Sequence, residues 1–572
     1  MKRRKSYLAL MTGLTAVLVA SACSANKSSD TNSAATLMKG EANTINAGTA
    51  KQGGSITYVL ERNIVDWNPL AADIGVATQL VADVYDPSTF VTAPDLKSID
   101  LNKDLLVSAE QVSASPQVLV YKISPKAVWS DGTPISADDF SYTWKTQDPR
   151  SCPKCETATT MGYDHIKSVV GTDGGKTVTV TLTQPFGDWK SMFAPILPAQ
   201  VAKKLGDDGT PAGLAKSFND GFRYASSFPD WSGGPFIFKS WQTNQAATLV
   251  PNPKWYGKPV TVDSLIFRVI TDTTQEVPAL QNNEVQVINP QPQIDLLRNV
   301  KALSGINYQL VPGLRKEEFL PNLKTPALKD PVLRRALFTA TDVQQIIDKT
   351  VGQFDSQTKP LRNRIYVPQS PEYQDNLGEL GSGSLDKAKA MLSAGGYTLN
   401  AGKLIDPKGV AVPPLTMRYV VGNQIQQTEC ELFTATAKAL GVTINAQSTD
   451  SIGATVTHQA GKDFDIFAFT WVGQTFLATQ YSQAFMSNAG LNFGNYSSPK
   501  VDSLLTQALT TTDSTKLAGL LNDVDKQLSD DAFIMPLYQQ PILLAYKSNL
   551  VNVRANGTYF GVPYNGGEWG IK

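Results

Sequence analysis

The chain has 572 residues, of which 51 are basic, 51 are acidic and only two are histidine. Without the four basic residues of the N-terminal signal described next, the net charge is about −4, which gives no electrostatic reason to bind DNA, RNA or anionic lipid. Four cysteines and two histidines are too few for a disulfide-built scaffold or a histidine-rich metal centre.

The first 22 residues have the pattern of a secretory signal. Lys2-Arg3-Arg4-Lys5 forms a basic start, and the apolar run 7–20 is shorter than the roughly 20 residues that span a bilayer. The small residues Ser21-Ala22 then precede Cys23, which is the lipobox arrangement, although Ala20 stands where a lipobox usually has Leu. We expect the Cys23 thiol to receive a diacylglyceryl group; the alternative is an ordinary secretory signal with an incidental cysteine.

Removing the signal leaves 550 residues, enough for two or three domains. Residues 23–52 are rich in Ser, Thr, Asn, Ala and Gly and lack aromatic side chains, so they predict a flexible tether. Order is expected to begin with a strand at 55–60, where Ile56, Tyr58 and Leu60 recur at every second position. We therefore expect a protein anchored by lipid to the extracytoplasmic face of the cell membrane.

The rest of the chain alternates between strand and helix patterns. Further strands are predicted at 118–123, 177–182, 264–270 and 442–444. Helices are predicted after the capping box of Ser136 and Asp139, over 274–282, from Asp330-Pro331, from Leu385 and over 428–440. This alternation indicates a mixed α/β chain.

Four segments carry distinctive motifs in chain order. They are residues 128–140 (VWSDGTPISADDF), then 233–236, 251–259 and 279–285 (GGPF, PNPKWYGKP, ALQNNEV), then 333–342 (LRRALFTATD), and 535–538 (MPLY). Together they resemble the bacterial extracellular solute-binding proteins of family 5, which include the oligopeptide- and dipeptide-binding components of ABC importers. Within this family, the segments AVWSDGTPI, PALQNN, WVG and NFG are most similar to those of the oligopeptide-binding lipoproteins of mycobacteria and their actinobacterial relatives.

The resemblance implies a two-lobe α/β fold of the periplasmic-binding-protein type (type II, cluster C), with a ligand buried between hinged lobes. The first lobe is expected to be discontinuous (53–100, 230–315 and 537–572), with an inserted domain at 101–229 and a second lobe at 316–536. The implied function is capture of an oligopeptide or related peptide-like solute and its delivery to ABC permease subunits in the membrane. The implied protein is a monomer that performs no catalysis and needs no cofactor.

The segment that follows Thr470 carries the main candidates for ligand contact. In peptide-binding relatives, a similar segment places an Asp against the α-ammonium group of the peptide, and here Trp471 and Gly473 fit that pattern while Gln474 replaces the acid. A buried ammonium without a charged partner costs several kcal/mol, and Gln offers only a neutral hydrogen bond of roughly 1 kcal/mol. We therefore expect a neutral or N-blocked ligand, or an amine held by Glu61 or Asp66.

Other candidate ligand residues are aromatic, amide and hydroxyl side chains near the expected cleft: Trp231, Thr475, Asn492, Asn495, Tyr496, Glu61, Asn63 and Trp67. Tryptophans stack on ligands but more often pack in a core. The 492–496 segment is equally consistent with a structured turn, and the residues after the first strand with a solvated loop.

Cys152 and Cys155 form a lone CxxC motif. A zinc site needs two more ligands and a redox site needs a thioredoxin-like unit, so a small structural disulfide is expected. Cys430 is expected to be buried, and His165 and His458 to be surface or structural residues.

Two other functions stay open. A sensory or cell-envelope lipoprotein would share the binding fold but lack an importer. A secreted hydrolase is the less favoured alternative, because no G-x-S-x-G or H-E-x-x-H motif is present.

Overall fold

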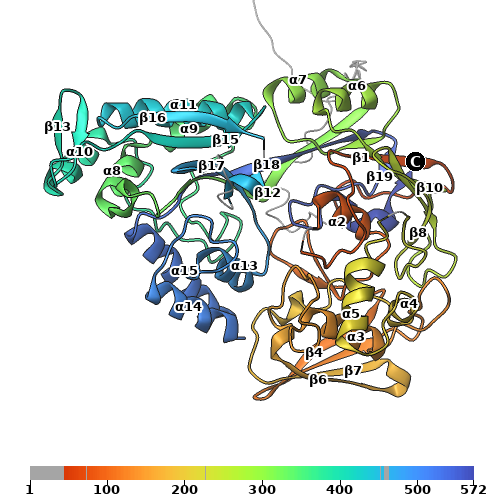
Figure 1. Cartoon of the computed structure of the whole chain (residues 1–572). Coiled ribbons are helices and arrows are strands. Elements are labelled where there is room, and N and C mark those ends of the chain that lie inside the picture. The colour runs from red at the N-terminus through yellow and green to blue at the C-terminus, as the bar shows by residue number, and fades with distance from the viewer. Residues whose placement is uncertain (1–43, 73, 226, 451, 457–462) are drawn as a thin grey trace, which may run out of the picture. The chain divides into compact units, whose positions relative to one another are not determined.

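The computed structural model describes residues 44–572 except 73, 226, 451 and 457–462 (Figure 1). Cys23, the signal, the first part of the predicted tether and His458 lie outside the described residues. No helix in the described part of the chain has the length and apolar character needed to cross a membrane.

A ten-stranded mixed sheet is the centre of the fold, in the order β16-β15-β17-β12-β18-β11-β1-β10-β9-β8. In that order, the strands are Ile444–Thr449, Leu415–Val420, Ile466–Val472, Ile306–Pro321, Met535–Lys547, Val287–Ile288, Ser55–Leu60, Ser264–Val269, Ala246–Pro251 and Phe236–Gln242. β1 is parallel to β10 and β11, and β15 is parallel to β16 and β17, whereas β12 and β18 run antiparallel to each other. These two long strands join the two halves of the sheet.

A second sheet lies in the inserted domain. It is antiparallel with the order β4-β5-β7-β6, and its strands are Leu106–Ala114, Gln117–Ile123, Thr177–Leu182 and Ile166–Thr172. Three two-stranded ribbons complete the strands: β2 with β3 (Phe90–Thr92, Ile99–Leu101), β13 with β14 (Thr398–Asn400, Lys403–Ile405) and β19 with β20 (Leu550–Val551, Gly570–Ile571).

The helices of the first lobe and inserted domain are α2 Val76–Ala82, α3 Ala137–Gln147, α4 Ala199–Lys204, α5 Pro211–Lys216, α6 Glu276–Gln281 and α7 Ile294–Ala302. Those of the second lobe are α8 Pro331–Ala340, α9 Val343–Lys349, α10 Leu385–Ala394, α11 Gln424–Ala439, α12 Ile452–Val456, α13 Leu477–Phe485, α14 Pro499–Thr510 and α15 Ser514–Asp530. In the second lobe, α11 packs along β15 and β16, and α14 packs between α13 and α15 (Figure 1).

Several predicted elements have the expected bounds and caps. β1 and β7 match the predicted strands, and α3 begins at the capping box, where Asp139 accepts a hydrogen bond from the Ser136 N–H at 2.8 Å. α8 begins after Asp330, whose carboxylate accepts from the Val332 N–H at 2.9 Å. These starts are encoded by neighbouring residues, so the sequence predicts them well.

Three predicted elements differ most from the structure. α11 begins at Gln424, earlier than predicted, because Asn423 caps the Gln426 N–H at 3.1 Å. β16 begins at Ile444, because the Val442 N–H still bonds the carbonyl of Ala437 and completes the end of α11. The predicted helix over 274–282 is divided into a 3-10 turn at 273–275 and α6.

The end of the predicted tether is also corrected. Ile45 is buried, its carbonyl accepts from Arg554 Nε at 2.9 Å, and Lys51 pairs with Ile571. Residues 44–52 therefore belong to the folded body, because they cover the segment that follows β18.

Burial is concentrated in several apolar clusters. The first and largest joins β1, α2, the inserted domain and the strands β8 to β10. The second contains Phe319, Phe433 and Leu537, and the third contains Phe467, Tyr481 and Phe533. Residues of β12 and β18 contribute to clusters on both sides, Val311 and Leu544 to the first and Phe319 and Leu537 to the second. These two strands thus connect the cores of the two lobes.

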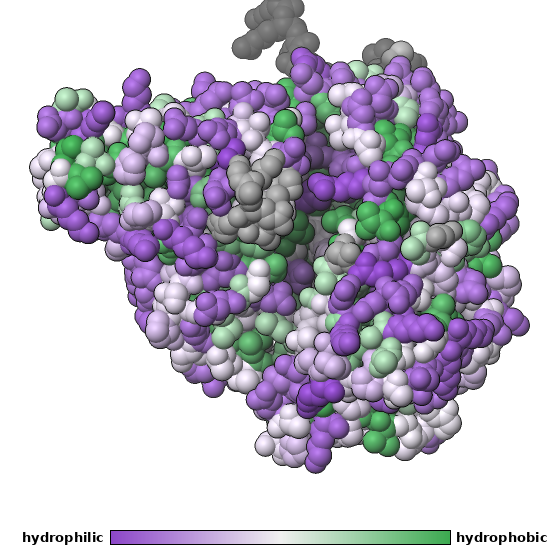
Figure 2. All heavy atoms as spheres, in the orientation of Figure 1, coloured by the Kyte–Doolittle hydropathy of each residue, from purple (hydrophilic) through white to green (hydrophobic). Residues whose placement is uncertain are grey.

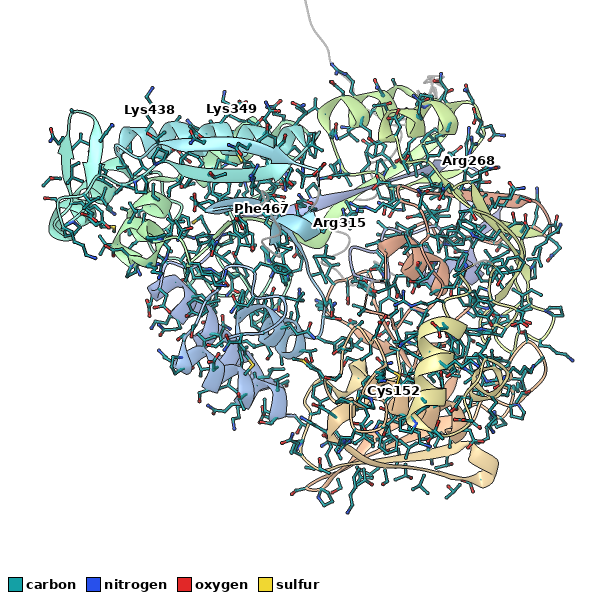
Figure 3. All side chains as sticks on the ribbon, in the orientation of Figure 1. Cys152, Arg268, Arg315, Lys349, Lys438 and Phe467 are labelled. Carbon is teal, nitrogen blue, oxygen red and sulfur yellow. A yellow bond between two sulfur atoms is a disulfide. The ribbon has the colours of Figure 1, made fainter. Side chains whose placement is uncertain are left out.

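In the inserted domain, Cys152 and Cys155 are joined by a disulfide close to the start of α5 (Figure 3). Cys430 is a free thiol buried in the core of the second lobe. His165 lies beside Asp164 at 3.6 Å.

Candidate functional site

The end of β17 is held against β12 by backbone contacts. Val472 lies opposite Arg315 in the β12–β17 ladder, and the Gly473 N–H donates to the carbonyl of Leu314 at 3.0 Å. A Cβ atom on Gly473 would lie 2.5 Å from that oxygen, so a larger residue cannot take this place without a shift of the chain. Glycine here allows the loop that follows β17, residues 472–476 (the ligand loop), to leave the sheet close to β12.

The ligand loop is ordered by the helix that follows it. Gln480 in α13 accepts from the Gln474 N–H at 2.8 Å and donates to the Val472 carbonyl at 3.0 Å. The Gln474 side chain is exposed. Its amide group therefore remains available to a solute.

Thr475 joins the ligand loop to the first lobe. Its hydroxyl lies 2.8 Å from the hydroxyl of Thr92, and Asn556 donates to the Thr92 carbonyl at 3.0 Å. Two parts of the chain 383 residues apart thus meet at this loop.

Trp471 is half-buried at the edge of the third core. Its ring lies 5.8 Å from Phe469 and 6.2 Å from Phe493. Its indole N–H has no acceptor among the described residues, and the ring lines a cavity of about 10 Å³ with Glu318 and Arg364. A cavity of this size is at the lower limit for one water molecule, so the unpaired indole donor has no room for a solute group in this state.

A charged cluster lies where β1 ends. Glu61 accepts from the Gln291 N–H at 3.3 Å, and burial raises its pKa above the usual range while the charge of Arg315 opposes the rise. Glu276 is fully buried, and burial together with the charge of Glu61 raises its pKa to about 9. The charge of Arg315, labelled in Figure 3, thus acts on Glu61, and its backbone lies opposite Val472 at the start of the ligand loop.

A cavity of about 140 Å³ lies between segments of both lobes. It is lined by residues 94–97, by Pro312 of β12 and by Pro368 and Gln369. Small-molecule pockets commonly measure roughly 300 Å³ or more, so this cavity alone does not hold a peptide-like solute. On the face shown in Figure 2, hydrophilic residues predominate and hydrophobic residues form small groups, and Val65 and Val472 are 67% and 46% exposed.

Two predicted ligand tryptophans are core residues instead. Trp231 is 4% exposed and packs edge-on against Tyr85 and Trp129. Trp67 is 2% exposed and packs edge-on against Phe238. The prediction that they contact ligand is corrected, because their rings are enclosed by other aromatic side chains.

The 492–496 segment is a structured turn. The Asn492 amide bonds the Tyr496 carbonyl at 2.7 Å and accepts from the Tyr496 N–H at 2.9 Å, Asn495 donates to Asn322 at 3.0 Å, and the Tyr496 ring stacks on Phe533 at 4.6 Å. These polar groups are used within the protein, so the ligand-contact interpretation of Asn492, Asn495 and Tyr496 is corrected in favour of the turn.

Among the remaining candidates, Asn63 is exposed beside Glu61. Asp66, proposed as a partner for an amine, is buried and pairs with Arg223 at 3.2 Å. Its charge is therefore already compensated.

Sequence reasoning missed Arg315, Thr92 and Asn556. One signal was present for Arg315, since residues 315–318 are four consecutive charged residues inside a strand pattern. In the described residues, no group of three or more His, Cys, Asp or Glu side chains is arranged to hold a metal ion.

Comparison with known proteins assigns this architecture to a family. Residues 100–493 match the model of the bacterial extracellular solute-binding proteins, family 5. The chain belongs to this family. The predicted family and two-lobe fold are thereby confirmed, as is the role of a solute-binding component of an ABC importer at the level of the family.

Individual relatives cover nearly the whole chain. The oligopeptide-binding protein OppA of Mycobacterium tuberculosis is 28% identical over 96% of this chain and 91% of its own. The solved structure of the periplasmic EDTA-binding protein EppA is 34% identical, covers 93% of this chain and 98% of its own, and superposes with a TM-score of 0.88. The oligopeptide-binding protein AppA of Bacillus subtilis, in complex with a nonapeptide, is 20% identical with a TM-score of 0.73 over 92% of this chain and 100% of its own, and shows the shared fold.

Proposed function

We propose that this protein captures a peptide-like solute that does not need a free amino terminus and delivers it to the permease subunits of an ABC importer. The observation that carries this proposal is the exposed Gln474 amide on the ligand loop, at the place where the resemblance to peptide-binding relatives implies a carboxylate. Capture and release involve no chemical step. A lipid on Cys23 holds the monomer at the extracytoplasmic face of the membrane.

The charges around the loop support a solute without an ammonium group. Asp66 already pairs with Arg223, and Glu61 has a raised pKa and lies near Arg315. None of these groups is a free carboxylate that could replace an acid at position 474. A buried ammonium group therefore finds only weak compensation here.

A second candidate solute is a compound with several carboxylates. The 34% identity to EDTA-binding EppA favours it, and Arg315 offers a planar set of donors suited to carboxylate. Neither candidate solute needs an ammonium group, and calorimetric titration with compounds of both kinds distinguishes them.

The experiment is calorimetric titration of the protein with pentaalanine, N-acetyl-pentaalanine and EDTA, together with native mass spectrometry of any retained solute. N-acetyl-pentaalanine is expected to bind at least as tightly as pentaalanine, and EDTA to bind if the second candidate is right. Gln474→Asp is expected to increase the affinity for free pentaalanine, whereas Gln474→Asn leaves it unchanged. A retained peptide with a free amine, or tenfold tighter binding of pentaalanine by the wild type, contradicts the proposal.

A further inference from the structure

Asp188 of the inserted domain caps a helix of the second lobe. Its carboxylate accepts from the Thr479 N–H at 2.8 Å, and the residue is 8% exposed. Thr479 is the third residue of α13, and the residue at the N-cap of this helix, Phe476, offers no side-chain acceptor. The first N–H groups of a helix need acceptors, which a side chain at the N-cap usually supplies. Here the acceptor comes from 291 residues away.

The neighbouring backbone makes a second contact with the same lobe. The Gly187 N–H donates to the carbonyl of Leu509 at 2.7 Å. A Cβ atom on Gly187 would lie 2.1 Å from the carbonyl oxygen of Thr511, so only glycine allows this approach. The side chain of Leu509 packs against both the first and the third apolar cluster.

The carboxylate and the helix end compensate each other. Burial raises the pKa of Asp188, and the hydrogen bond from Thr479 opposes this rise. The N-terminus of α13 carries partial positive charge, which favours an acid at this place. When Asp188 and α13 separate, the carboxylate loses its hydrogen-bond donor and the first turn of α13 loses its acceptor.

The helix end so capped is continuous with the ligand loop. Phe476 connects the loop to α13, and Gln480, one residue after Thr479, binds the backbone of Val472 and Gln474. Any displacement of the first turn of α13 therefore moves the groups that hold Gln474 in place.

We propose that Asp188, assisted by Gly187, is a positioning residue through which the inserted domain orients the ligand loop for solute binding. This inference rests on the proposed function only in that the ligand loop contacts the solute. It assigns to the inserted domain a part in solute capture.

Hydrogen–deuterium exchange of the solute-free protein tests the inference directly. Asp188→Ala is expected to increase the exchange of amides in residues 473–480 by about fivefold, the size of a typical lost cap. Asp188→Asn keeps an oxygen acceptor and is expected to remain within about twofold of the wild type.

The matched control is Asp513→Ala, which removes the cap that Asp513 provides to the Lys516 N–H of α15 at 2.9 Å. It is expected to increase exchange at the start of α15 and to leave residues 473–480 unchanged. If Asp188→Ala changes residues 473–480 no more than Asp513→Ala does, the inference is overturned. If Asp188→Ala does not fold, Asp188→Ser, whose hydroxyl is too short to reach Thr479, is judged by the same criterion.

A binding measurement with N-acetyl-pentaalanine supplies the functional part. Its affinity is expected to fall about fivefold in Asp188→Ala, to recover in Asp188→Asn and to stay unchanged in Asp513→Ala. Failure of the wild type to bind this probe contradicts the proposed function, while the exchange experiment alone still decides whether Asp188 positions the loop.

Discussion

At the scale of single residues, Gly473 is a position of the ligand loop that has no room for a side chain. Its amide bonds Leu314, and a Cβ atom would lie 2.5 Å from the Leu314 oxygen and 2.9 Å from the Leu314 Cβ. Both contacts are with the main chain or the first side-chain atom, so neither can rotate away. The neighbourhood of Gln474 depends on this close approach.

Gly473→Ala is expected to reduce affinity for N-acetyl-pentaalanine by about tenfold and to cost about 1–3 kcal/mol of unfolding free energy, because the loop must move away from β12. Calorimetric titration and urea unfolding measure the two effects. Gly519→Ala is the control: it lies within α15 with nothing near its Cβ position and is expected to stabilise the protein by about 0.5–1 kcal/mol. Unchanged binding in Gly473→Ala would show that the close approach is not required.

Glu276 makes stability depend on pH. Its pKa in the folded protein is about 9, raised by burial and by the charge of Glu61 above its ordinary value of 4.5. The folded state therefore holds a proton that the unfolded state releases between these values, and stability falls as the pH rises through this window. Glu276→Gln removes this term.

Thermal unfolding of the wild type and Glu276→Gln is expected to give similar midpoints near pH 5 and a growing advantage for the Gln variant towards pH 9. Differential scanning calorimetry at several pH values measures the difference. Parallel curves over the whole range would contradict the assignment.

The residue scale also shows the limit of sequence reasoning about the site. Trp67 and Trp231 have the composition of ligand-stacking residues, but whether an indole faces a ligand or a core depends on neighbours such as Phe238 and Tyr85, which lie far along the chain. The position of Gln474 and Thr475 on the loop after β17 could be predicted, because the local pattern of Trp471 and Gly473 identifies this segment.

At the scale of elements, the segment before Tyr366 is attached to α15 by a buried ion pair. Arg364 lies 3.2 Å from Asp525, and both side chains are almost completely buried. The Arg364 N–H also donates to Asp525 at 2.9 Å, and the guanidinium bonds Ser529 at 2.7 Å. Within the second lobe, this network fixes α15 to the segment that contains Arg364.

Asp525→Ala is expected to cost about 3–5 kcal/mol in unfolding free energy, because it leaves the Arg364 charge buried without its partner. Urea unfolding followed by circular dichroism measures this. Asp295→Ala, which removes one partner of the exposed Asp295–Arg298 pair, serves as control and is expected to have little effect. Equal losses in the two variants would mean that burial of the pair does not matter.

Elements were predictable to the extent that their signals are local. The starts of α3, α8 and α10 follow from Ser136, Asp330 and Ser384, which bond amides two or three residues away. The predicted start of β16 at Val442 is wrong, because the Val442 amide completes the end of α11. The sequence near Val442 carries a strand signal and a helix-end signal, and neither signal alone shows which one the structure follows.

At the scale of the whole molecule, the Thr92–Thr475 contact joins the two lobes beside the ligand loop. The hydroxyl oxygens are 2.8 Å apart, so the two side chains point toward each other across the lobes. Thr92 and Thr475 belong to different lobes, so any separation of the lobes at this place breaks the contact.

A Thr92→Cys, Thr475→Cys variant is expected to form a disulfide on oxidation and to release previously bound N-acetyl-pentaalanine at least about tenfold more slowly. Mass spectrometry detects the bond, and tryptophan fluorescence after dilution measures the release rate. The Thr92→Cys single variant controls for the substitution. Equal release rates in oxidised and reduced double variants would exclude this contact as part of the opening path.

The lobes and their family could be predicted from sequence because four motifs carry them in order. The partners that complete the site could not, because Thr92, Asp188 and Arg315 reach the ligand loop only after β12 and β17 pair and the inserted domain meets α13. Thr92 and Asp188 have no local signal in the sequence, and the charged run 315–318 marks Arg315 without showing which residues it meets.

The position of β18 has a consequence for the order in which the fold can form. Residues 535–547 lie between β12 and β11, so the two halves of the ten-stranded sheet are joined by a strand that is synthesised after both of them. Until that strand emerges, β11 and β12 each lack a neighbour and the sheet is divided into two incomplete halves. The order of synthesis thus delays completion of the ten-stranded sheet until residues 535–547 are available to pair with β11 and β12.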